Sequence, residues 1–167
     1  ARRELELHRR ACDEAQRLLQ SVLGDISSNT PIPGARRVAD LHRSVGHTIL
    51  DLGDDDFTRG RAHPMIDATS RRERLAQELA DPETALVLLD VVLGFGSHGD
   101  MAGELAATIR AARGKGTPLP VIAASICGTD EDPQDAKAQT LRLEDEGVRV
   151  FPSHASMIRF AAEILRA

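Results

Sequence analysis

The segment from Gly53 to Asp67 gathers many chemically active side chains into one connection. It carries a run of three carboxylates followed by two arginines and a histidine, namely Asp54, Asp55, Asp56, Arg59, Arg61 and His63. The segment follows a short apolar run, residues 48–52, that reads as a strand, and it precedes a helical pattern that begins near Ser70. Loops at the carboxyl ends of strands are where α/β sheets bind their ligands. The local arginines favour a small anionic ligand here.

Two further loops with unusual composition follow apolar runs that read as strands buried on both faces. The loop after residues 85–92 contains Gly94, Gly96, Ser97, His98 and Gly99, and the loop after residues 119–126 contains Gly128, Thr129 and Asp130. Glycines let a backbone approach a ligand closely. Helices that start near residues 70, 100 and 133 would offer free N–H groups to an anion. The three loops together predict a phosphate or carboxylate pocket at one edge of a sheet.

Each of these features also has a purely structural interpretation. The three aspartates form an acidic turn that suits solvent, and Arg59 and Arg61 could pair with them. His63 precedes a proline and could simply donate to a backbone carbonyl, whereas His98 could be an ordinary exposed histidine. His98 is the first choice for contacting a phosphoryl group, because flanking glycines give it freedom and a helix start follows it. His63 is the competing choice, since it lies in the more distinctive segment.

The predicted elements that would position these loops alternate between strand and helix. Helical patterns cover residues 3–23, 70–80, 101–113 and 133–146, a short polar helix is expected over 35–44, and a last helix follows Ser153. Strands are expected over 48–52, 85–92, 119–126 and 148–151, and residues 25–35 read as a loop. This order predicts a doubly wound α/β fold with four parallel strands and helices on both faces, in three layers.

The composition excludes several classes of function. The chain of 167 residues is expected to form one domain, and it carries a net charge of −5 with four Phe, no Trp and no Tyr. Binding of nucleic acid is therefore not expected, because it relies on positive charge and aromatic stacking. The two cysteines have no metal-ligand spacing, so no metal site is predicted. Without an apolar run near 18 residues or a signal peptide, no membrane association is expected and the chain is predicted to be cytoplasmic.

One part of the chain resembles the receiver domain of response regulators. Leu88-Leu89-Asp90-Val91 resembles the strand that carries the phosphorylated aspartate, and residues 120–125 resemble the next strand with its terminal hydroxyl residue. The resemblance implies a phosphoacceptor role for Asp90. It ends at Pro152-Ser153-His154, where receivers need a lysine, and the 53–70 loop has no receiver counterpart.

Nearly the whole chain is more similar to the FdrA family, whose members resemble succinyl-CoA synthetase. The most specific match is Phe57-Thr58-Arg59-Gly60-Arg61 with His63-Pro64-Met65-Ile66-Asp67. Further matches are Cys12-Asp13-Glu14-Ala15, Asp51-Leu52-Gly53-Asp54-Asp55-Asp56, Asp90-Val91-Val92-Leu93-Gly94-Phe95-Gly96, Gly128-Thr129 and Asp132-Pro133-Gln134. The resemblance implies that residues 1–167 are a flavodoxin-like CoA-ligase domain. It also implies a fragment of a longer protein with a CoA-binding region ahead of Ala1.

The resemblance implies acid–thiol ligation by the full-length protein, with coenzyme A and ATP or ADP as cofactors, and it leaves Mg²⁺ open. It implies a small carboxylate, phosphate or nucleotide as ligand, and an oligomer or partner subunits. The isolated domain is expected to be inactive. In the catalytic subunit of succinyl-CoA synthetase a phosphohistidine follows the strand that matches 121–126, but here loop 127–133 has no histidine. FdrA-like proteins are also linked to carbamoyl transfer in oxamate and allantoin catabolism, which is the main alternative.

Overall fold

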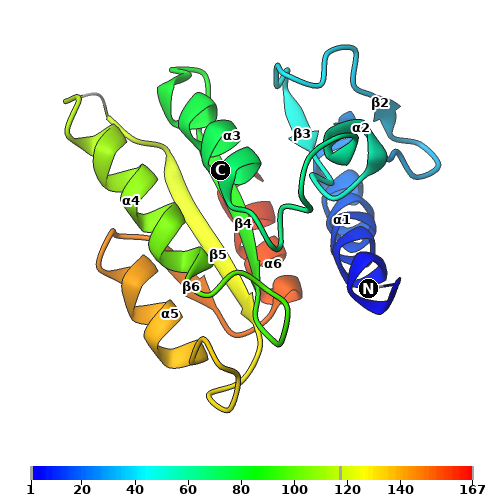
Figure 1. Cartoon of the computed structure of the whole chain (residues 1–167). Helices are drawn as coiled ribbons and strands as arrows, with labels where there is room; N and C mark the ends of the chain where they lie inside the picture. The colour runs from blue at the N-terminus through cyan, green and yellow to red at the C-terminus, as the bar shows by residue number, and fades with distance from the viewer. Residues whose placement is uncertain (1, 117, 167) are drawn as a thin grey trace. The chain divides into compact units, whose positions relative to one another are not determined.

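The computed structural model describes residues 2–116 and 118–166, with side chains from Arg10 onward (Figure 1). It divides into two compact units, Ala1–Arg61 with Ile158–Ala167, and Ala62–Met157. Each unit contains one three-stranded sheet, and every described strand pair is parallel. The predicted α/β class with parallel strands is therefore confirmed.

The first unit is built on a small sheet in the order β2-β1-β3. Its strands are β1 (Ile26–Ser28), β2 (Arg36–Arg37) and β3 (His47–Ile49). The long helix α1 (Arg2–Leu23) contacts β1 and β3, and buries Ala15 and Leu19 together with Ile26 of the central strand. A single helical turn, α2 (Asp55–Thr58), follows the sheet.

This sheet corrects three expectations. Residues 25–35 contain strand β1 in addition to a loop, and the helix expected over 35–44 is wrong, because strand β2 and turns occupy that range. The strand predicted near residue 48 pairs with β1, so the expected single four-stranded sheet is split over two sheets. The signals were weak because strands of two or three residues show no periodicity. Ser27 and Ser28 also resemble turn residues in composition.

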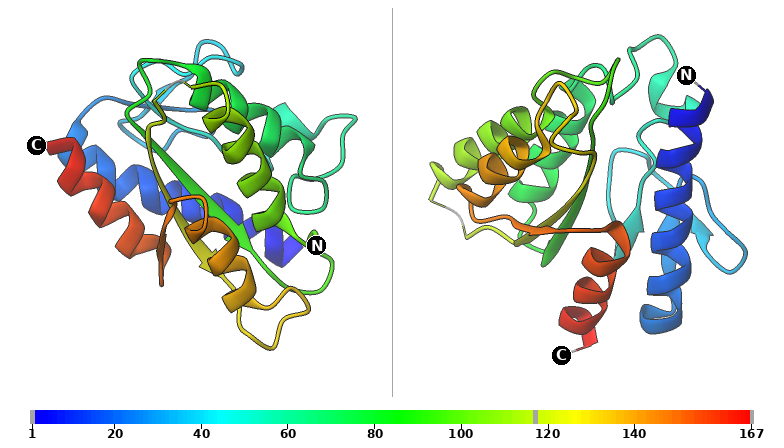
Figure 2. Two further views of the ribbon diagram at one scale, coloured as in Figure 1. Left: turned by 90° about the vertical axis from the view of Figure 1, so that its left-hand side faces the viewer. Right: turned by 90° about the horizontal axis from the view of Figure 1, so that it is seen from below.

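The second unit contains the larger sheet, in the order β4-β5-β6. Its strands are β4 (Leu86–Val92), β5 (Val121–Cys127) and β6 (Arg149–Phe151). Three helices lie side by side along one face of this sheet: α3 (Thr69–Ala80), α4 (Met101–Arg113) and α5 (Ala136–Glu144) (Figures 1 and 2). The fully buried side chains of Val91, Leu105, Ile109 and Leu143 lie in the core between sheet and helices.

The structure shows which residues precede and cap the last two helices. Helix α5 begins at Ala136 with Asp135 as its N-cap, so Pro133 lies in the preceding turn and not in the first helical turn. The last helix, α6 (His154–Arg166), follows Ser153, whose hydroxyl accepts a hydrogen bond from the Ser156 amide at 3.2 Å, as an N-cap residue does.

Strands β4 and β5 end in register, with Val92 paired to Cys127. The loops that follow them, residues 93–100 and 128–135, therefore leave the sheet at the same edge. Helix α3 begins at this edge too, because Arg71 in its first turn reaches Asp90 near the end of β4. The second unit thus brings together residues 62–68, 93–100 and 128–135.

Candidate functional site

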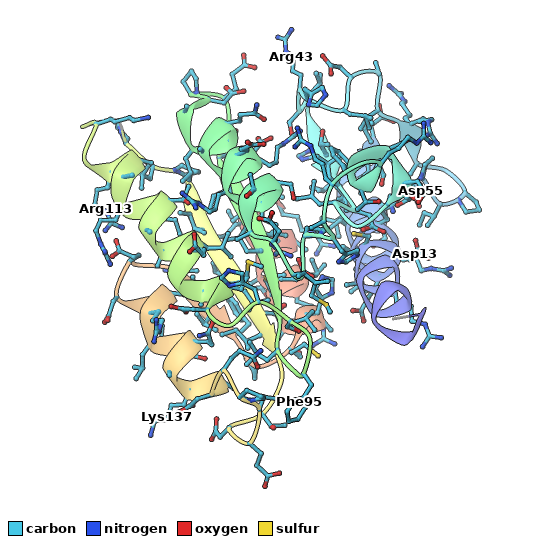
Figure 3. All side chains as sticks on the ribbon, in the orientation of Figure 1. Asp13, Arg43, Asp55, Phe95, Arg113 and Lys137 are labelled. Carbon is cyan, nitrogen blue, oxygen red and sulfur yellow. The ribbon has the colours of Figure 1, made fainter. Side chains whose placement is uncertain are left out.

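The β4–α4 loop, residues 93–100, makes a glycine-dependent turn. Gly94 and Gly96 adopt φ values of 133° and 89°, which side-chain-bearing residues rarely tolerate. Phe95, between them, is 86% exposed at the tip of the turn (Figure 3). A Cβ atom at Gly96 would meet no atom within 4 Å, so the backbone there is open to approach by a ligand.

The side-chain amide of Gln134 fixes this loop from the neighbouring one. Its Oε1 accepts a hydrogen bond from the Gly94 amide at 3.1 Å, and its Nε2 donates to the Gly94 carbonyl at 2.9 Å and to the His98 carbonyl at 3.4 Å. The residue is only 8% exposed. Gln134 therefore sets the distance between the two loops and the path of the glycine turn.

Both candidate histidines belong to this edge, because the segment 62–68 lies against the glycine loop. The His98 amide donates to the Met65 carbonyl at 2.7 Å. Hydrogen bonds from the hydroxyl and amide of Thr69 hold the pKa of Asp67 below its usual range, and the nearby charges of His98 and Arg72 lower that pKa further. The structure thus brings His63 and His98 onto neighbouring segments. The sequence predicted this from a strand of the same sheet before residue 53, but that strand, β3, belongs to the other sheet.

The helix starts at this edge are less open to an anion than the sequence suggested, because each carries an aspartate. Asp100 accepts from the Gly103 amide, Asp135 accepts from the Lys137 and Ala138 amides, and Asp67 accepts from the Thr69 amide. These carboxylates already satisfy amides in the first turn and complement the helix dipole. The glycine turn, rather than these helix ends, is the part of the edge suited to an oxyanion.

The Asp100 carboxylate is itself held by helix α5. Its Oδ1 accepts from Gln139 Nε2 at 2.9 Å, and its Oδ2 pairs with the Arg142 guanidinium. Gln139 is buried and its Oε1 accepts from the Ala102 amide at 2.9 Å. The start of α4 is therefore anchored on its neighbour, and this fixes the residues directly before it.

In the β5–α5 loop, Gly128 and Thr129 were predicted to bind phosphate, and both already make contacts within the protein. The Thr129 amide and hydroxyl both donate to Asp132 Oδ2, at 2.6 and 3.3 Å. A Cβ atom at Gly128 would lie 2.6 Å from the Leu93 side chain, so glycine there permits close packing of the two loops. Binding of phosphate by Gly128 and Thr129 stays a prediction.

The acidic segment and its arginines lie in the first unit. Asp54 caps helix α2 by accepting from the Asp56 amide, and Asp56 pairs with Arg37 at 3.0 Å. Asp55 is exposed in the same helical turn (Figure 3). Arg59 and Arg61 follow this turn, and both are exposed. Their participation in anion binding stays a prediction.

Asp90, the residue that the receiver resemblance would phosphorylate, is engaged by a buried arginine. Arg71 Nη2 lies 3.1 Å from Asp90 Oδ1 and also donates to the Asp90 carbonyl oxygen. The Arg71 side chain is 8% exposed and the Asp90 side chain 32% exposed. One oxygen of the Asp90 carboxylate is therefore occupied by a charge-assisted hydrogen bond.

We expect that acetyl phosphate with Mg²⁺ will not phosphorylate Asp90 stoichiometrically. Arg71 occupies one carboxylate oxygen, and Pro152-Ser153-His154 after β6 offers no lysine to stabilise an acyl phosphate. Intact-mass spectrometry of the treated chain, with the Asp90→Asn variant as control, measures this. A base-labile phosphoryl adduct that forms on the chain and is absent from the variant would contradict the expectation.

Gln134, Gln139 and Arg71 were not predicted as site residues. Their partners lie 19 to 40 residues away along the chain, so no local pattern marks these contacts, although Gln134 belongs to the matching string Asp132-Pro133-Gln134. A signal was present for Asp100, because an aspartate directly before a helical pattern is a typical N-cap. In the described part of the chain no cluster of three or more His, Cys, Asp or Glu side chains is arranged to hold a metal ion.

None of the helices described over residues 2–116 and 118–166 combines the length and the apolar character that crossing a membrane requires.

Comparison with known proteins identifies the family. Residues 11–164 match the CoA-ligase family. The chain is also 41% identical over 158 residues to a protein of Escherichia coli K12 named "Uncharacterized protein YahF". That alignment covers 92% of this chain and 30% of the relative, so the chain spans less than a third of the length of the protein it matches. Because the family match extends over nearly its entire length, the chain belongs to the CoA-ligase family.

Proposed function

We propose that this chain is the CoA-ligase domain of an FdrA-like acyl-CoA synthetase, and that loops 62–68 and 93–100 hold the phosphoryl group of the reaction. The observation that carries the proposal is the hydrogen bond from the His98 amide to the Met65 carbonyl. It brings a histidine-bearing segment against a glycine-rich turn at the carboxyl edge of a parallel sheet, which is where such sheets bind ligands.

The chemistry of these loops fits a phosphoryl group. The turn offers unobstructed backbone at Gly96, and His98 can donate a hydrogen bond to an oxyanion beside it. Coenzyme A, when bound by the full-length protein, would supply the thiol, and ATP would supply the phosphoryl group and leave as ADP. The role of this chain would be to orient the phosphoryl oxygens, with Gln134 holding the turn in shape.

Titration of the ¹⁵N-labelled chain with inorganic phosphate tests the proposal. We expect the amide resonances of residues 94–100 and 63–68 to shift with saturation at millimolar phosphate. Resonances near Glu146, at the far end of α4 and α5, should not shift. Chloride at equal ionic strength is the control for non-specific binding. Shifts spread evenly over the surface, or confined to other segments, would contradict the assignment of this edge.

Replacing Gln134 with alanine should weaken phosphate binding at least fivefold, because the turn loses three hydrogen bonds that fix it. Gln77, exposed on α3, provides a matched control, and the Gln77→Ala variant should bind phosphate as the parent does. The same titration measures both variants. Equal binding by the two variants would remove Gln134 from the proposed role.

The class of reaction is tested by assaying a longer polypeptide that contains this chain. CoA thioester formation from a carboxylic acid, CoA and ATP would support the synthetase proposal. Turnover of carbamoyl phosphate without thioester formation would instead identify a component of a carbamoyltransferase. The resemblance to FdrA-like proteins leaves that alternative open, because both reactions handle a carboxylate and a phosphate.

A further inference from the structure

The imidazole ring of His98 is held by its own chain through one nitrogen. The Asp100 amide donates to His98 Nδ1 at 3.1 Å. His63 shows the same arrangement, since the Met65 amide donates to His63 Nδ1 at 3.2 Å. A ring nitrogen that accepts an N–H carries a lone pair and no proton. In the neutral ring the proton must therefore be on Nε2.

We infer that His98 acts at this edge as an Nε2–H hydrogen-bond donor to a phosphoryl or acyl-phosphate oxygen and not as a phosphorylated nucleophile. This inference rests on the proposed function, which supplies the anion. A neutral imidazole attacks phosphorus through its unprotonated nitrogen, and in His98 that nitrogen faces the Asp100 amide. Attack through Nε2 would first require moving the proton to Nδ1. Two N–H groups would then point at each other.

The backbone on either side of the His98 side chain is held by hydrogen bonds to other segments. The Asp100 carboxylate is held by Gln139 and Arg142, so the backbone amide that reaches the ring is fixed in place. On the other side, the His98 amide donates to Met65 and the His98 carbonyl accepts from Gln134. Changing the tautomer would therefore require rearranging the start of α4.

The two histidines differ in how far they are buried. Nε2 of His63 is buried, whereas the His98 residue is half-buried in the open glycine loop. The backbone at Gly96, two residues before His98, leaves open space for a ligand. His98 is therefore the donor in this inference. His63 is a structural neighbour, and its ring is likewise oriented by a backbone amide that donates to Nδ1.

Long-range ¹H–¹⁵N spectra of the chain labelled at its histidines measure the tautomer directly, at a pH where the rings are neutral. We expect His98 to show a protonated Nε2 and an unprotonated Nδ1, and its Nε2 resonance to shift on addition of inorganic phosphate. A protonated Nδ1 in the neutral ring would overturn the inference whether or not phosphate binds. A correct tautomer without any response to phosphate in loop 93–100 would overturn the proposed function of this edge, and with it the ligand assigned to His98.

Two variants separate donor from nucleophile. Glutamine can place an N–H near the position of Nε2, whereas asparagine places its N–H near that of Nδ1. We expect His98→Gln to bind phosphate within about threefold of the parent. The His98→Asn variant should bind at least tenfold more weakly, as expected for loss of a hydrogen bond to a charged group. Far-UV circular dichroism confirms that both variants fold. Equal loss in both variants would overturn the donor role.

The longer polypeptide that contains this chain provides the chemical test. The donor role predicts that no acid-labile phosphoryl group forms on His98 during the reaction. A phosphohistidine at position 98, detected by peptide mass spectrometry under alkaline conditions and absent from His98→Gln, would overturn the inference. It would leave the proposed function of the edge standing.

Discussion

Replacing Arg71 with alanine is expected to lower the free energy of unfolding by about 3 kcal/mol. The guanidinium is 8% exposed and bonds both the carboxylate and the carbonyl of Asp90 in β4. Alanine would remove the arginine that pairs with this carboxylate near the end of β4. Urea unfolding followed by circular dichroism is the suitable measurement, because the chain has no tryptophan to report by fluorescence.

Arg72, the next residue of α3, is a matched control for Arg71. It pairs with Glu104 at 2.9 Å, but its side chain is 52% exposed and that of Glu104 is 35% exposed. A surface pair of this kind contributes about 0–1 kcal/mol. The Arg72→Ala variant should therefore unfold at nearly the same urea concentration as the parent. If the two alanine variants lost equal stability, burial of the Arg71–Asp90 pair would not be the cause.

The second unit could be predicted well from the sequence because its signals are local and strong. The apolar runs at 85–92 and 119–126 predicted β4 and β5 to within two residues at each end, and the pattern at 101–113 predicted α4 at its observed bounds. Strands buried on both faces need continuous apolar residues, and this requirement leaves a clear pattern. The convergence of the two loops on one edge followed directly from the parallel order.

The first unit was harder to predict because its strands are formed by tertiary pairing. Strand β2 consists of two exposed arginines, which local propensity would not place in a sheet. The roles of individual site residues were also hard to predict, because they depend on contacts that form only in the folded chain. Asp54 and Thr129 were chosen for their polar groups, but the structure uses those groups in a helix cap and a turn as well.

Four buried amide side chains share a role that no local pattern could reveal. Gln16, Asn29, Gln134 and Gln139 are all less than 9% exposed, and each bonds backbone groups of a loop or helix start. Each unit contains two of them. Such an amide satisfies a backbone N–H and a C=O where the chain leaves regular structure. The loops of both units are therefore fixed by side chains from elsewhere in the sequence.

The Asn29 amide is expected to be the most important of these for the first unit. Its Oδ1 accepts from the Asp51 amide at 2.9 Å and its Nδ2 donates to the Asp51 carbonyl at 3.0 Å, joining the ends of β1 and β3. Both residues are buried. Asn29→Ala removes two buried hydrogen bonds and should lower the free energy of unfolding by about 3 kcal/mol. Urea unfolding measures the loss, and Ser21→Ala, at an exposed site on α1, should change stability by less than about 0.5 kcal/mol.

An Asn29→Asp variant shows whether the hydrogen bonds or the loss of packing cause this effect. At neutral pH its carboxylate would still accept from the Asp51 amide but would face the Asp51 carbonyl, so it should be no more stable than Asn29→Ala. Facing that carbonyl raises the pKa of the introduced carboxyl above its value in the unfolded chain. The protonated carboxyl should then stabilise the folded variant below about pH 4, and this stabilisation should be lost as pH rises through the folded-state pKa. The two variants share every other titrating group, so the difference between their unfolding free energies isolates this one carboxyl. A difference that does not depend on pH would mean that packing, and not the paired hydrogen bonds, holds β1 to β3 at Asn29.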